Sequence, residues 1–266
     1  MFALKKTNKI LLILLAFTFF NCKQSDPIKT EFTLVWEDQF SGTEIDAEKW
    51  EFQIGDGVNY GLWRWGNNEE QYYRKENARV SNGKLLIKAV AEEFENYQYT
   101  SARMRTKGKA DFKYGKIEAM IRMADTQGLW HAFWLLPSNP SQNWPISGEI
   151  DIMEYVGKTP GEIHNTLHTK DSYGISKNTK ITTLKNIEDG FHVYKMNWDK
   201  NQIQFSIDNE IGYTFAPKEK SDTIWPFDKP FYLILNLAVG GHWTDGYVAP
   251  GFDQATYEID YVRIYQ

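Results

Sequence analysis

Apolar and polar residues alternate in many short stretches of the chain after Thr30, with the two-residue period of β-strands. In residues 116–123 every second residue is apolar, and residues 202–207 alternate in the same way. Turn-forming pairs such as Asn82-Gly83 separate these stretches. No segment carries an apolar helical stripe four turns long. The pattern therefore predicts an all-β fold, a two-sheet antiparallel sandwich.

Three carboxylates interrupt an otherwise apolar run between residues 148 and 154. On a strand, Glu149 and Asp151 point to the same face, and regular alternation would send Glu154 to the other. One extra residue at positions 152–153, a β-bulge, would return Glu154 to the shared face. Clustered carboxylates repel one another and are costly to desolvate, which favours a functional site over a solvated acidic edge. Glycoside hydrolysis uses such a set, with one carboxylate as nucleophile or base and one carboxylic acid as proton donor.

The residues around this run, 144–157, closely resemble the active-site strand of glycoside hydrolase family 16 in its laminarinase-like branch. An isolated E-x-D-x-x-E pattern would be weak evidence for this family. Six other segments match the family in the expected order, namely residues 65–69, 100–103, 114–119, 129–134, 236–241 and 259–265. The resemblance covers residues 32–266, which is a whole domain.

The resemblance implies a β-jelly roll whose concave face carries a substrate cleft. It implies that Glu149 is the nucleophile, that Glu154 is the general acid/base, and that Asp151 assists between them. A retaining enzyme of this kind has its two carboxyl groups about 5–5.5 Å apart. The family also places a histidine close to the carboxylates, at the position of His168. From the residues alone, a structural role and a catalytic support role for His168 remain equally open.

Flat aromatic rings stack on the apolar faces of sugars, and the chain contains 10 Trp and 15 Tyr. By resemblance, the substrate-binding residues are Trp130, Trp134, Trp144, Trp243, Asn67, Glu70 and Arg103. The family often holds a structural calcium away from the cleft, and the matching positions are Glu37, Gly83 and Asp260. The five His are scattered without zinc-site spacing, so no cofactor is expected for catalysis.

The chain has 266 residues, of which 42% are hydrophobic, enough for one large domain with a sizeable core. Its net charge is −5, and no Lys/Arg block follows the N-terminal region. This charge pattern argues against nucleic acid as a partner and fits a neutral polysaccharide. We expect a monomer.

The N-terminus has the pattern of a targeting segment. Lys5, Lys6 and Lys9 precede an apolar run of 11 residues, 10–20. This run is shorter than the roughly 20 residues that span a bilayer, and it suits the core of a signal peptide. The lone cysteine, Cys22, follows and resembles the lipidated cysteine of a bacterial lipoprotein.

This pattern predicts a signal peptide over 1–21, a polar tether over 22–31 and a catalytic domain over 32–266. The expected location is the cell envelope, as a surface-exposed lipoprotein of the outer membrane that touches the membrane only through its lipid anchor. Lipoprotein signals usually carry a small residue where this chain has Asn21, so ordinary secretion is the alternative.

The leading functional hypothesis is retaining endo-hydrolysis of β-1,3 bonds in laminarin-type β-glucans. One alternative is a non-catalytic β-glucan-binding protein on the same fold, although such relatives typically lack the acids at positions 149, 151 and 154. The other is a sibling specificity, for mixed-linkage glucan, agarose, porphyran or carrageenan. Fold alone does not separate these substrates.

Overall fold

The computed structural model describes residues 32–266, which form one compact unit. The predicted signal peptide, the tether and Cys22 lie outside the described residues. In the part of the chain that the structure describes, no helix is both long and apolar enough to cross a membrane.

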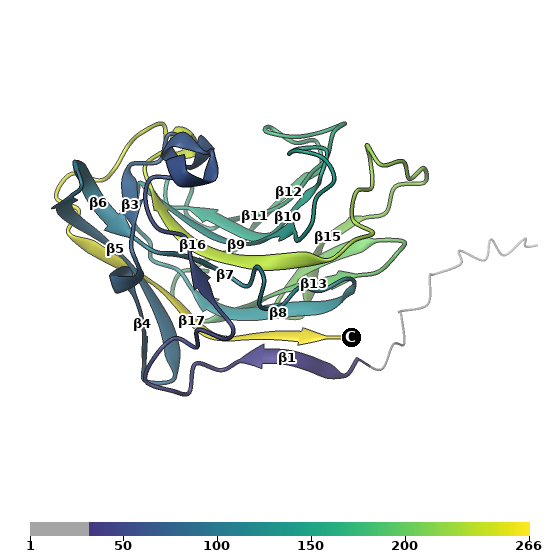
Figure 1. Ribbon diagram of the computed structural model, residues 1–266, viewed down its shortest axis with the longest axis horizontal. Helices are drawn as coiled ribbons and strands as arrows, with labels where there is room; N and C mark the ends of the chain where they lie inside the picture. Colours follow the sequence, from purple (N-terminus) through teal and green to yellow (C-terminus); the bar gives the residue numbers. More distant parts are fainter. Residues whose placement is uncertain (1–31) are drawn as a thin grey trace, which may run out of the picture. The chain divides into compact units, whose positions relative to one another are not determined.

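Two β-sheets lie one over the other (Figure 1). The first sheet has ten strands in the order β15-β14-β13-β8-β17-β5-β6-β3, with β1 beside β17 and β4 beside β5. These strands are β1 (Leu34–Asp38), β3 (Gln71–Tyr73), β4 (Ala78–Ser81), β5 (Lys84–Phe94), β6 (Tyr97–Ser101), β8 (Gly115–Arg122), β13 (His192–Trp198), β14 (Ile203–Ile207), β15 (Glu210–Phe215) and β17 (Gln254–Tyr265). The last strand, β17, pairs with β5, β8 and β1 and so joins the first and last strands of residues 32–266.

The second sheet has seven strands in the order β12-β11-β10-β9-β16-β7-β2, and Figure 1 shows it bent, with its concave side turned away from the first sheet. Its strands are β2 (Glu51–Phe52), β7 (Arg103–Arg105), β9 (Leu129–Pro137), β10 (Glu149–Val156), β11 (Glu162–His168), β12 (Thr179–Thr183) and β16 (Phe231–Val239). Every strand pair in both sheets is antiparallel except β3–β6. The only helices in residues 32–266 are short 3₁₀ turns, η1 (Val58–Tyr60), η2 (Trp63–Gly66), η3 (Lys75–Asn77) and η4 (His242–Thr244). The predicted all-β sandwich is therefore confirmed.

The core fills the space between the two sheets. On β8 the predicted apolar set, Ile117, Ala119 and Ile121, is fully buried, because alternate side chains of a strand share one face. All nine residues of β16 are buried. One face of β16 packs into the core, and the other lies beneath the side chains on the concave side. This buried layer supports β9, which pairs with β16, and through β9 it supports β10.

Strand β10 contains the predicted bulge. In its pairing with β9, Asp151 and Met153 face consecutive residues, so Ile152 is the extra residue. The pairing with β11 shifts by one residue over the same stretch. Ile152 and Met153 are both buried in the core, and Glu154 returns to the face that carries Glu149 and Asp151. The strand thus buries apolar residues on one side and gathers three carboxylates on the other.

The predicted calcium ligands lie at the edge where β17 changes partner. Asp260 stands at an irregularity in the register of β17, next to the β4–β5 turn that contains Gly83. The carboxylate of Glu37 accepts hydrogen bonds from Arg263 at 3.3 Å and from Gln39 at 2.8 Å. Both hydrogen bonds go to Oε2 of Glu37. Calcium at Glu37, Gly83 and Asp260 stays a prediction.

Deleting Ile152 should destabilise the fold, because removing one residue from a strand turns the following side chains to the opposite face. Glu154 would then enter the apolar core or force the ladder out of register. We expect the free energy of unfolding in urea to fall by at least about 2 kcal/mol. Ile152→Val keeps the bulge and should cost only about 0.5–1.5 kcal/mol. A deletion variant as stable as the Val variant would contradict this account of the bulge.

Candidate active site

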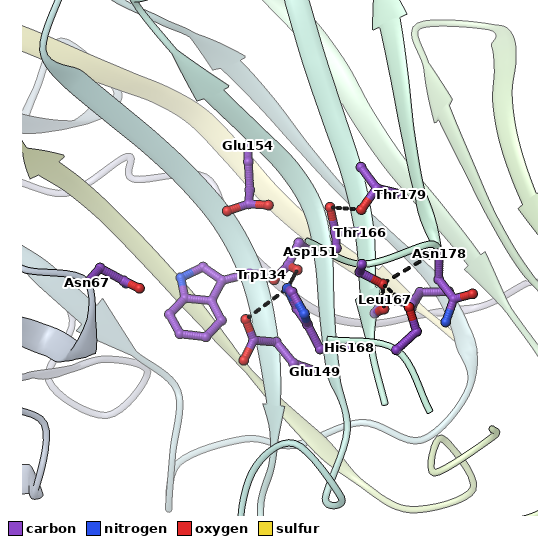
Figure 2. A network of polar contacts seen from close by, with 12 residues as sticks. Asn67, Trp134, Glu149, Asp151, Glu154, Thr166, Leu167, His168, Asn178 and Thr179 are labelled. Carbon is purple, nitrogen blue, oxygen red and sulfur yellow. Dashed lines mark hydrogen bonds and ion pairs between the residues drawn. The ribbon is translucent and has the colours of Figure 1, made fainter. Parts of the chain in front are cut away.

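The three carboxylates of β10 lie together on the concave side of the second sheet (Figure 2). Asp151 and Glu154 are 2% and 8% exposed, and Glu149 is partly buried. Trp134 lies beside them on β9, and His168 lies beside them on β11. The structure therefore brings the predicted catalytic residues into one group.

His168 contacts two of the carboxylates. It stands opposite Glu149 in the β10–β11 register, and its Nε2 lies 3.9 Å from Glu149 Oε1 and 3.3 Å from Asp151 Oδ2. Its Nδ1 is buried and has no hydrogen-bond partner within residues 32–266. The imidazole therefore faces the acids with one nitrogen, which supports a role at the site. Oxygen and nitrogen atoms of these three residues lie within 4.8 Å of one another, close enough to hold a cation.

The carboxylate of Glu154 is held in place by a row of packed aromatic side chains. The indole Nε1 of Trp130 donates a hydrogen bond of 3.1 Å to Glu154 Oε1. Trp130 packs edge-to-face against Trp243 of η4, with ring centroids 5.0 Å apart, and Trp243 packs likewise against His164 at 4.8 Å. The turn at residues 240–246 thus fixes the carboxylate of Glu154 through two indole rings. This gives Trp130 and Trp243 a positioning role in addition to the predicted contact with sugar.

Trp134 is fixed from two directions. Its Nε1 donates a hydrogen bond of 2.8 Å to Asn236 on β16. The guanidinium of Arg103 lies between the rings of Trp134 and Trp65, 4.8 and 4.6 Å from their centroids, in cation–π contact with both. Arg103 is only 5% exposed and also donates to Gln53. The predicted sugar-contacting Arg103 therefore also orients a neighbouring tryptophan.

A buried carboxylate that the sequence analysis missed, Glu69, completes this network. It accepts hydrogen bonds from Asn67, Gln71 and Tyr73 at 3.1, 2.7 and 3.1 Å. These four residues have a spacing of two, the strand period that places side chains on one face, and this signal could have identified Glu69. The predicted residue Glu70 is off this period and forms a 2.9 Å ion pair with the side chain of Arg64.

Burial changes the acidity of the cluster. It raises the pKa of Glu149 to about 8, with repulsion from Asp151 adding and the charge of His168 opposing. Burial likewise raises the pKa of Asp151 to about 8 and that of Glu154 well above its usual value. Since ionising one acid makes the next harder to ionise, the cluster loses its protons in steps, and between these steps an ionised and a protonated carboxyl group stand side by side. General acid chemistry beside a carboxylate nucleophile requires this state.

Asp151→Asn should stabilise the protein at alkaline pH. The pKa of Asp151 is higher in the folded protein than in the unfolded chain, so its contribution to stability is complete below about pH 4 and is lost as pH rises through about 8. The amide cannot ionise. We expect the variant to match the wild type at pH 4 and to exceed it by about 1–3 kcal/mol at pH 9 in urea unfolding. The exposed Asp253→Asn control should show no such trend, and a variant less stable than the wild type at pH 9 would contradict the pKa direction.

The chain matches the model of "Glycosyl hydrolases family 16" over residues 63–263. A β-glucanase of Rhodothermus marinus is 38% identical over 279 aligned residues, which cover 99% of this chain and 95% of that protein. The crystal structure of a laminarinase from Flavobacterium sp. UMI-01 is 46% identical, has a TM-score of 0.83, and covers 88% of this chain and 100% of its own.

The catalytic domain of an endo-1,3-β-glucanase (laminarinase) from Thermotoga petrophila is 37% identical, with a TM-score of 0.84 over 89% of this chain and 98% of that domain. Family model, curated relative and solved structures therefore agree over nearly the whole described fold. The acidic strand, its bulge and the sandwich around it are those of an established family, and this chain belongs to glycosyl hydrolases family 16.

Proposed function

We propose that this protein is a retaining endo-1,3-β-glucanase that acts on laminarin-type β-glucan. The observation that carries the proposal is the bulged strand β10, which gathers Glu149, Asp151 and Glu154 on one face and raises the pKa of all three. The endo-1,3-β-glucanase and laminarinase names of the relatives favour the β-1,3-glucan substrate.

In the first step, ionised Glu149 attacks the anomeric carbon of a bound glucosyl unit while the bond from that carbon to the bridging oxygen breaks. Protonated Glu154 gives its proton to the departing oxygen. The hydrogen bond from Trp130 holds the Glu154 carboxyl group in one orientation. The step leaves a glycosyl ester on Glu149 and an ionised Glu154.

In the second step, Glu154 acts as a base and takes a proton from water as the water oxygen attacks the anomeric carbon. The ester bond to Glu149 breaks, and Glu149 leaves as a carboxylate. Two inversions give a product with the β configuration of the substrate. The charge of His168, whose Nε2 lies 3.9 Å from Glu149, favours the ionised form of Glu149, whereas the neighbouring Asp151 raises the pKa of Glu149.

Substrate rings would lie against the tryptophans of β9. Trp130 and Trp134 are both partly exposed, and each has its indole N–H already bonded to a protein group. Their rings are therefore held in fixed positions before substrate binds, which reduces the entropy lost on binding.

A non-catalytic glucan-binding protein would not need a protonated acid beside two other carboxylates, so the composition of the site favours the enzyme. Sibling specificities are separated by measuring reducing-end release from laminarin, lichenan, agarose and carrageenan. The proposal predicts the highest rate on laminarin. A higher rate on another polysaccharide would make that polysaccharide the substrate, while the assignment as a retaining glycoside hydrolase would stand.

Glu149→Ala and Glu154→Ala should each lower the rate of laminarin hydrolysis at least about 1,000-fold, while Asp151→Asn should leave a small residual rate. Azide should partly rescue Glu149→Ala and give a glycosyl azide of inverted configuration, because a small anion can fill the space of the missing nucleophile. The exposed Glu93→Ala serves as the control and should keep the wild-type rate. Undiminished turnover by Glu149→Ala without azide would refute the assignment of the nucleophile.

We also propose that the protein is anchored in the cell envelope through a lipid on Cys22. A lipid chain adds membrane affinity without a transmembrane helix, and an anchored enzyme keeps its oligosaccharide products near the cell. We expect Cys22→Ala to move activity from the membrane fraction to the soluble fraction or to block maturation. Wild-type protein found wholly in the medium without attached lipid would favour simple secretion.

A further inference from the structure

We propose that the loop between β11 and β12, residues 169–178, forms an outer sugar-binding subsite in which Tyr173 and Trp144 hold a ring of the glucan chain beyond the rings at the carboxylates. The inference rests on the proposed function, because it takes a glucan chain as the occupant. It assigns to Tyr173 a role in recognising long substrates.

The loop is held in one conformation by its own hydrogen bonds. Ser172 Oγ lies 3.1 Å from Ser176 Oγ and accepts the amide of Lys177 at 2.7 Å. Ser176 Oγ donates to the carbonyl of Leu167 on β11 at 2.9 Å and accepts the amide of Asn178 at 3.0 Å. The base of the loop lies next to His168 in Figure 2. The loop is therefore preorganised and fixed to the strand that carries His168.

This loop presents Tyr173 beside an exposed tryptophan. Tyr173 is 54% exposed and Trp144 is 48% exposed, although both are large aromatic residues. Their rings lie nearly perpendicular, at 79°, with centroids 5.6 Å apart. Two perpendicular rings form an open corner that offers the face of one ring, the edge of the other and the phenolic hydroxyl of Tyr173. Such a corner suits a sugar ring, which has an apolar face and hydroxyl groups.

The corner is continuous with the catalytic group. The Trp144 ring lies 5.9 Å from the ring of His168, and His168 lies within 4 Å of both Glu149 and Asp151. A glucan chain that leaves the carboxylates on this side passes Trp144 first and then Tyr173. This continuity identifies the occupant as another unit of the same chain.

The experiment compares kcat/KM on laminarin with kcat/KM on laminaritriose for each variant, because only the longer chain reaches past Trp144. Tyr173→Ala should lower the laminarin-to-laminaritriose ratio about 3- to 10-fold. Tyr173→Phe keeps the ring and should keep the ratio. Ile175→Ala changes a fully exposed apolar residue of the same loop that has no aromatic partner, and it should match the wild type on both substrates.

If the wild type is active and Tyr173→Ala leaves the laminarin-to-laminaritriose ratio unchanged, the proposed subsite is wrong, and the proposed function stands. An equal loss on both substrates also overturns it, because it indicates a structural role for the loop. Tyr173→Leu, which keeps an apolar side chain without a ring, tests the same ratio if the Ala variant does not fold. A wild type without activity on laminarin overturns the proposed function and the subsite with it.

Discussion

The active site depends on a conflict between the strand period of two and the odd separation, three positions, of two carboxylates. A strand can put an acid at every second position on one face, but Asp151 and Glu154 are three residues apart. The unpaired Ile152 resolves this conflict, because it adds one residue without breaking the ladder on either side. The same step keeps Ile152 and Met153 in the core. The packing of the core and the grouping of the three carboxylates therefore both require the bulge at Ile152.

Ionising carboxylates gathered in this way is unfavourable, and the surrounding residues determine how unfavourable it is. Around Glu154 the charged form is favoured first by the charge of His168 and then by the hydrogen bond from Trp130. Around Glu149 the charged form is favoured by the charge of His168. Farther out, the buried Glu69 and Arg103 hold tryptophan and asparagine side chains rather than reacting groups. The concave side is thus a layered polar network whose outer members fix the positions of its inner ones.

The sequence was sufficient for the parts of the structure that follow from local periodicity. Alternation predicted the sandwich, and the spacing of the acids predicted the bulge, because both depend on neighbours along one strand. Glu69 was passed over in favour of Glu70 although its period with Gln71 and Tyr73 is local; its bridge to Gly240 comes from a distant part of the sequence. Tyr173 carried no local signal, because its relevance comes from the position of Trp144 about thirty residues earlier. The ion pair of Glu37 with Arg263 carried no local signal either, because the two residues lie far apart in the sequence.

Strand β17 has a consequence for how the chain reaches its folded state. It is a central strand of the larger sheet, and its neighbours β1, β5 and β8 come from the first half of the chain. Those strands cannot complete their hydrogen-bonded ladder until the last twelve residues of the fold are available. Closing such distant contacts is slow, and the unfinished sheet exposes strand edges in the meantime. The domain therefore folds as a whole once residues 254–265 have been synthesised, rather than piece by piece as it emerges.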